Sequence, residues 1–155
     1  MNIKSFRKSM ATNEINRIRL STNNGLMGYR INKFQVISGN PVSESDRWVL
    51  KIFTTEKDEN GSERKPTVTV NFDDPTLLAV GVFSSNENSQ IYPEDMTIVF
   101  DNMKINQDIF VTAKAESGTR VNYYLELEQM KLSKDEATVA TLKDMRAGPD
   151  TNFGP

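Results

Sequence analysis

The sequence contains no histidine and no cysteine among its 155 residues. Histidine is the side chain whose unperturbed pKa allows it to give and take protons near neutral pH. Without these two residue types, Ser-His-Asp and Cys-His nucleophiles are excluded, and so are zinc sites built from nitrogen and sulfur ligands. Disulfides are excluded as well. We therefore expect a protein that is not an enzyme and that holds no cofactor and no metal.

Long apolar runs are also missing. No stretch approaches the roughly 18 apolar residues that a membrane span requires, and the first residues, MNIKSFRKSM, lack the apolar core of a secretory signal. No glycine-rich phosphate-binding motif occurs. We expect no membrane partner, and the length fits a single domain.

The charges are unevenly spread along the chain. Residues 1–57 hold ten Lys and Arg against four Asp and Glu, a net charge of +6, and the remainder holds nine against seventeen, a net charge of −8. Either strands from both parts interleave and the charges mix, or a basic patch faces an acidic patch on a neighbouring copy. The second arrangement favours a homo-oligomer or a lattice.

Alternation of apolar and polar residues predicts eight or nine β-strands, of which eight have clear bounds. They span residues 14–21, 27–37, 47–55, 67–72, 77–83, 96–100, 108–115 and 121–132. The alternation slips between Ile31 and Phe34, which indicates a bulge. The pairs Asn24-Gly25 and Asn60-Gly61 favour hairpins, because a type I′ turn needs a positive φ at both central residues.

The pattern changes near the C-terminus. Ser133 and Glu136 have the spacing of a capping box, which predicts a helix over residues 134–146. The fold class expected is all-β, an antiparallel, jelly-roll-like β-sandwich with one short C-terminal helix. Residues 1–12 are expected to be an N-terminal arm, 13–146 the sandwich domain and 147–155 a tail. The expected core is Trp48, Leu50, Ile52, Val68, Val70, Leu78, Val80, Val82, Ile98, Phe100, Val111, Tyr123, Leu125 and Leu127.

Three motifs offer binding or chemistry, each with a plainer structural interpretation. The pairs Asp73-Asp74 and Glu94-Asp95 have the composition of glycosidase carboxylates, but they flank prolines in turns. Residues 58–63 have the acidic composition of a calcium-binding loop, but they lack the twelve-residue ligand spacing and the flanking helices of such a loop, so a charged turn is the plainer interpretation. Four aromatic residues can form a sugar platform in a carbohydrate-binding β-sandwich, the alternative function, although the apolar strand around the first of them favours the core: Trp48, Tyr29, Tyr123 and Tyr124.

The two polar ends are the expected partner-binding segments. In the arm, Phe6 can pack on a neighbour while Arg7 and Lys8 pair with acidic groups; in the tail, Asn152 and Phe153 are the candidates. The arm has only three basic residues, Lys4, Arg7 and Lys8, and the whole chain has a net charge of −2. This is too little positive charge for strong phosphate binding, so nucleic acid is not the partner we expect.

Residues 100–146, FDNMKINQDIFVTAKAESGTRVNYYLELEQMKLSKDEATVATLKDMR, resemble the C-terminal part of small virion proteins of tailed phages, and TNEINRIRLS at residues 12–21 has a similar look. The resemblance implies a β-rich structural protein in the virion, such as a capsid decoration (cement) or head–tail accessory protein. It implies other virion proteins or copies of the chain itself as partners. It contains no catalytic motif and assigns no functional residue.

Overall fold

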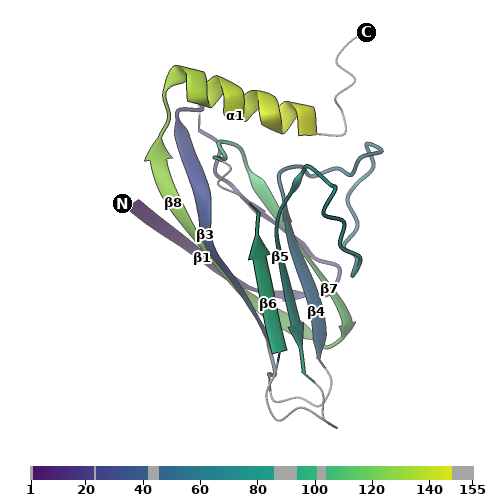
Figure 1. Cartoon of the computed structure of the whole chain (residues 1–155). Helices are drawn as coiled ribbons and strands as arrows, with labels where there is room; N and C mark the ends of the chain where they lie inside the picture. The colour runs from purple at the N-terminus through teal and green to yellow at the C-terminus, as the bar shows by residue number, and fades with distance from the viewer. Residues whose placement is uncertain (1, 23, 42–45, 86–93, 101–103, 148–155) are drawn as a thin grey trace.

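The protein folds into two antiparallel β-sheets followed by one helix (Figure 1). The computed structural model describes residues 2–22, 24–41, 46–85, 94–100 and 104–147. Within these residues the elements are β1 (Asn2–Ala11), β2 (Ile15–Ile18), β3 (Met27–Ser38), β4 (Arg47–Phe53), β5 (Leu77–Ser84), β6 (Glu94–Val99), β7 (Ile109–Ser117), β8 (Arg120–Lys131) and α1 (Lys134–Ala147).

The strand order is that of a jelly roll. The first sheet has the order β1-β8-β3 and the second has the order β2-β7-β4-β5-β6. Strands β4, β5 and β6 are consecutive neighbours, and β7 returns beside β4, which makes a Greek key. Strand β6 also contacts β3, so it borders both sheets. The predicted fold class, a jelly-roll-like β-sandwich with one C-terminal helix, is confirmed.

The core lies between the two sheets. Strand β8 turns Val121, Leu125 and Leu127 inward, and strand β4 opposes them with Trp48 and Leu50, all at 1% exposure or less. These are the residues whose alternation predicted the strands. Burying side chains of this kind contributes about 1.5–3 kcal/mol each relative to exposure.

Gly81 of β5 shows how closely the sheets approach. A Cβ atom at this position would lie 2.4 Å from Val36 Cγ2 and 3.0 Å from Phe34 Cε2. Both of those side chains belong to β3 of the opposite sheet. A larger residue here would force the two sheets apart, which explains the glycine in an otherwise apolar strand.

The two Asn-Gly pairs form turns, but neither joins two strands of a sheet as we predicted; Asn60-Gly61 instead closes a short antiparallel bridge between Lys57 and Glu63. Gly25 has a φ of 68° between β2 and β3, yet those strands lie in different sheets. Gly61 has a φ of 78° and its N–H donates to Asp58 O at 3.1 Å, inside the long connection from β4 to β5. A turn motif fixes the local direction of the chain, whereas sheet membership depends on distant partners. The predicted bulge in β3 is confirmed, because the register with β8 shifts between Ile31 and Lys33.

The predicted strand at residues 67–72 is wrong. This segment forms no strand and lies against the outward face of the second sheet, where Val70 packs beside Phe53. Val68, predicted to be in the core, is 48% exposed. Alternation is the same for a strand and for an extended segment lying over a sheet. Strand β4 already pairs with β5 and β7, so it has no free edge for a further strand.

The N-terminal arm is also a wrong prediction. Residues 2–11 form β1, which pairs with β8 over its whole length from Asn2↔Gln129 to Ala11↔Arg120. Phe6 is half-buried against the core and Met10 is fully buried. Lys4 and Lys8 lie on the same face of β1 as Phe6 and Met10. Because these two positions are charged, the sequence does not show the apolar–polar alternation that is typical of a strand.

The helix α1 lies across one end of the sandwich (Figure 1), and its predicted N-terminus is confirmed. Ser133 Oγ accepts from Glu136 N at 3.1 Å, and Glu136 Oε1 accepts from Ser133 N at 3.3 Å, which is a capping box. Buried Asn106 fastens the helix, because its Nδ2 lies 3.2 Å from Ala137 O and 2.9 Å from Thr141 Oγ1. The predicted tail residues Asn152 and Phe153 lie outside the described residues.

Candidate functional site

Two surfaces of the sandwich are candidates for binding, one on each sheet. The first is a groove of about 700 Å³ over the outward face of the first sheet. Antiparallel pairing sets side chains from β1, β8 and β3 in rows across it. One row is Arg7, Tyr124 and Gln35, and the next is Ser9, Asn122 and Ile37. Asp95 of β6 also lines the groove, and so do Lys8, Val36 and Tyr123 of the inward-facing row.

The structure therefore divides the three predicted partner-binding residues of the N-terminal segment. Arg7 and Lys8 line the groove, whereas Phe6 packs against the core. The other groove residues were not predicted from the sequence. The signal that identifies them is their register in the sheet, and that register is not visible in any one segment.

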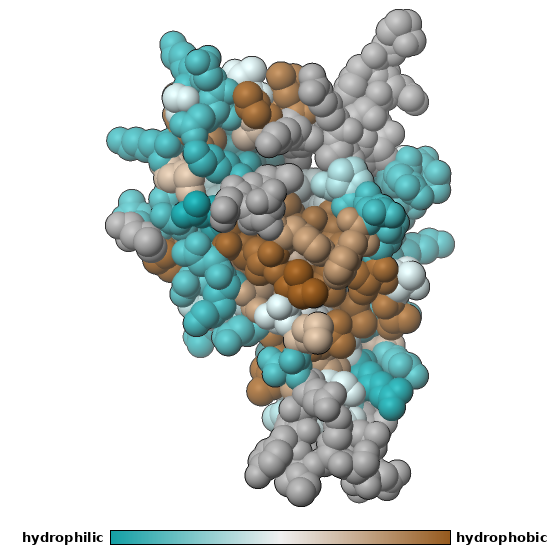
Figure 2. Space-filling model, in the orientation of Figure 1, coloured by the Kyte–Doolittle hydropathy of each residue, from teal (hydrophilic) through white to brown (hydrophobic). Residues whose placement is uncertain are grey.

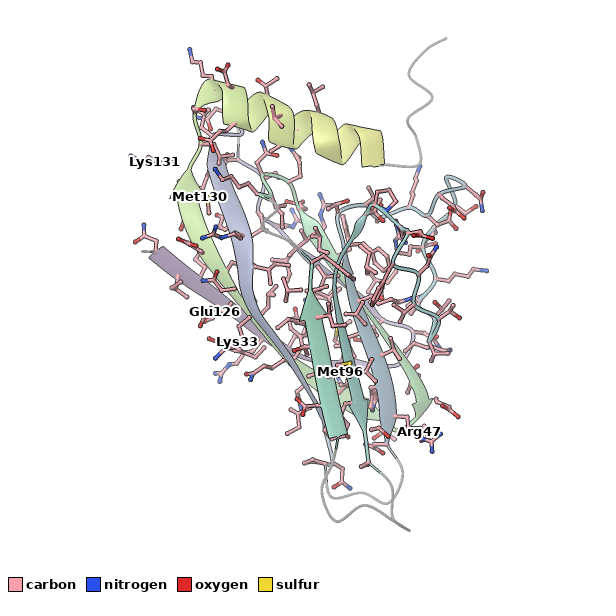
Figure 3. The ribbon with its side chains drawn as sticks, viewed as in Figure 1. Lys33, Arg47, Met96, Glu126, Met130 and Lys131 are labelled. Atoms are coloured by element: carbon pink, nitrogen blue, oxygen red, sulfur yellow. The ribbon has the colours of Figure 1, made fainter. Side chains whose placement is uncertain are left out.

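The hydroxyl of Tyr124 forms a hydrogen bond along β8. Tyr124 Oη donates to Glu126 Oε1 at 3.1 Å, and this bond, formed by the protonated hydroxyl, raises the pKa of Tyr124. Lys33 lies opposite Glu126 in the register of β3 and β8 and beside it in Figure 3. Arg30 forms an ion pair with Glu128 on the same face.

Ion pairs between segments that are distant in the sequence support the first of our two interpretations of the uneven charge. Arg17 pairs with Asp108 and Arg30 with Glu128, and Arg47 lies 3.5 Å from Glu116. Each pair joins the basic first third of the chain to its acidic remainder. The charges therefore mix within one molecule.

The second candidate surface is an apolar area on the outward face of the second sheet, which we call the apolar face. Val49, Val82 and Met96 form a row across β4, β5 and β6, and Ile98 extends it along β6. The area continues onto residues 66–72, where the rings of Phe72 and Phe100 meet edge to face at 4.8 Å. Met96 is 64% exposed and Phe72 is 59% exposed. Figure 2 shows apolar surface gathered at the centre of this side of the molecule.

Two buried cations hold residues 54–76 against the apolar face. Lys51 Nζ donates to Thr67 Oγ1 at 2.9 Å and to Thr69 O at 2.7 Å. Arg64 stacks on the ring of Phe53, with its Cζ 3.7 Å from the ring centroid. Burial lowers the pKa of Lys51 and the charge of Arg64 adds to this effect, while Asp74 opposes it. These contacts shape the rim of the apolar face.

Two of the acidic motifs form turns, whereas Glu94 and Asp95, which we expected in a turn, begin strand β6. Asp74 Oδ1 accepts from Thr76 N at 2.9 Å, and Asp58 Oδ1 accepts from Asn60 N and Ser62 N. Among the described residues, no cluster of three or more acidic side chains could hold a metal ion.

Three of the four aromatic residues proposed as a sugar platform are in the core. Trp48, Tyr29 and Tyr123 are each exposed by 5% or less. Tyr124 alone of the four lies on the outward face, in the groove.

Asp108 predicts a pH dependence of stability. Burial of its carboxylate acts to raise the pKa, but hydrogen bonds from Ser21 N, Arg17 and Leu20 N outweigh burial and lower the pKa from 3.8 to about 2. Stabilisation by this carboxylate is therefore present above about pH 4 and is lost as pH falls towards 2. We expect Asp108→Asn to lower the free energy of unfolding by about 1–3 kcal/mol near neutral pH. Urea titrations of both proteins at about pH 6 and about pH 2.5 measure this, because their stabilities should converge at the lower pH. A difference that stays constant over that range would contradict this role of Asp108.

No protein-family model and no curated protein matches the chain. Within the described residues, no helix has the length and apolar character needed to cross a membrane.

Proposed function

We propose that the protein is a non-enzymatic structural subunit of a tailed-phage virion, of the capsid decoration or accessory class. It binds neighbouring subunits of the particle through the apolar face. The observation that carries this proposal is the exposure of Met96 and Phe72, at 64% and 59%, within one contiguous apolar area. Such areas on folded domains mark contact surfaces, whereas apolar residues exposed singly do not.

The composition of the apolar face fits a protein contact. Met and Phe are enriched where protein surfaces meet, and charged residues are depleted at the centre of such contacts. The cations nearest its rim are already engaged, because Lys51 and Arg64 bind residues of the chain itself. A partner that is apolar at its own contact can therefore cover the face without burying an unpaired charge.

The virion assignment rests on the resemblance of residues 100–146 and 12–21 to small virion proteins. The jelly roll supports it at the level of fold, because viral capsid proteins use this architecture, but lectins use it too. We expected the contact surface on the N-terminal segment, but Phe6 of that segment packs against the core of the sandwich. We therefore place the proposed contact surface on the second sheet. Binding by Asn152 and Phe153 stays a prediction.

The test introduces a charge at the centre of the apolar face. We expect Met96→Glu to weaken binding by at least about tenfold, because the partner would have to bury an unpaired carboxylate. Co-sedimentation with virus particles that lack this subunit measures particle binding, and sedimentation velocity at rising concentration measures self-association. The matched control is Val139→Glu on α1, where the valine is 51% exposed and lies outside the face.

Equal binding by Met96→Glu and the unmodified chain would reject the apolar face as the contact. A chain that stays monomeric, binds no particle and binds a glycan would reject the virion function and favour a carbohydrate-binding module.

A further inference from the structure

We infer that the groove on the outward face of the first sheet is a binding site for a neutral saccharide. Tyr124 lies in the groove, and Arg7, Gln35, Asn122 and Asp95 line it. Its volume, about 700 Å³, falls in the range of sites that bind small ligands. The groove lies mainly on the first sheet, whereas the apolar face lies on the second, and the inference does not depend on the virion function.

The hydrogen-bonding side chains of the groove are available to a ligand. Within the part of the chain that the structure describes, the side chains of Arg7, Gln35, Asn122 and Asp95 form no hydrogen bond or ion pair with one another or with other residues. Tyr124 differs, because its hydroxyl donates a hydrogen bond to Glu126, while its ring remains open to the groove. The groove therefore combines an aromatic ring with unengaged polar groups around it.

The chemistry of these groups favours a saccharide. Arg7 only donates hydrogen bonds, ionised Asp95 only accepts them, and the amides of Gln35 and Asn122 do both. A sugar hydroxyl also donates and accepts, so it can pair with each of them. The ring of Tyr124 can pack on the apolar C–H face of a pyranose, as aromatic rings pack on other apolar surfaces.

Two other ligand classes fit less well. An anion would meet Arg7 but also the carboxylate of Asp95, so the groove is not the purely basic site that phosphate or sulfate requires. An extended peptide that adds to a sheet needs a free strand edge. The groove instead crosses the faces of β1, β8 and β3, whose main chains pair with one another.

The test begins with binding of the labelled full-length chain to a printed glycan array. The oligosaccharide with the strongest signal is then titrated by isothermal titration calorimetry. We expect Tyr124→Ala to weaken binding by about tenfold or more and Gln35→Ala by about threefold to tenfold, while Tyr124→Phe keeps the ring and most of the affinity. Val139→Glu, on α1 and away from the groove, should bind the saccharide like the unmodified chain.

Several outcomes would overturn the inference. One is an array on which no saccharide binds; another is unchanged affinity in both Tyr124→Ala and Gln35→Ala. Binding confined to sulfated glycans and abolished by salt would assign the groove to anions instead. Gln35 is exposed, so Gln35→Ala keeps the test valid if Tyr124→Ala fails to fold.

Discussion

Replacing Trp48 with alanine is expected to lower the free energy of unfolding by about 3–5 kcal/mol. The indole is the largest side chain that the sandwich buries completely, at 1% exposure, and it lies on the central strand β4. Among the described residues its Nε1 has no hydrogen-bond partner, so the loss reflects packing. Urea denaturation followed by circular dichroism measures the change.

The neighbouring residue supplies the control. Arg47 lies on the same strand but is half-exposed, and its contact with Glu116 is solvent-exposed as well. Arg47→Ala should therefore change stability by no more than about 0.5 kcal/mol. A loss below about 1 kcal/mol for Trp48→Ala would contradict the placement of this residue in the core.

Deleting residues 1–10 is expected to destabilise the whole sandwich. The deletion removes all but the last residue of β1, uncovers the edge of β8 and takes away the buried side chain of Met10. Truncation of a buried methionine alone costs about 2–5 kcal/mol. The uncovered edge of β8 also becomes a template for pairing with other chains, which promotes aggregation. Thermal unfolding and light scattering of the truncated chain measure both effects.

A control variant removes the two lysines of β1 but keeps the strand. It tests whether the stability comes from the charges of β1 or from its pairing with β8. The double variant Lys4→Ala with Lys8→Ala retains Phe6, Met10 and the ladder to β8, so its stability should stay within about 0.5 kcal/mol of the unmodified chain. A truncated chain that is soluble and as stable as the full chain would show that β1 adds nothing, which is what the sequence alone had suggested.

The prediction from sequence succeeded for those strands and that helix whose structure is determined by residues within the segment itself. The alternation of Val121, Tyr123, Leu125 and Leu127 is visible without a partner, and so is the capping box of Ser133 and Glu136. Strand β1 was missed because Lys4 and Lys8 occupy inward-facing positions at the edge of the sheet, where long side chains reach solvent. The tertiary context, not the local pattern, decides that such a segment is a strand.

The binding surfaces were predicted less well than the strands. Arg7 was singled out for its charge, yet its neighbours in the groove come from β3, β6 and β8. Register between strands decides which side chains meet, and a shift of one residue would turn each of them to the other face. The apolar face was missed for the same reason, since Val82 and Ile98 have the same alternation in an exposed face as in a core.

Hydroxyl-radical footprinting of the methionines tests the apolar face most directly. Met96 lies in this face and Met130 lies on the first sheet (Figure 3). Both are oxidised in the free chain in proportion to their exposure. We expect assembly onto the particle to slow the oxidation of Met96 by about tenfold and to leave Met130 unchanged, because only Met96 would lie within the contact. Unchanged oxidation of Met96 in the assembled particle would contradict the account.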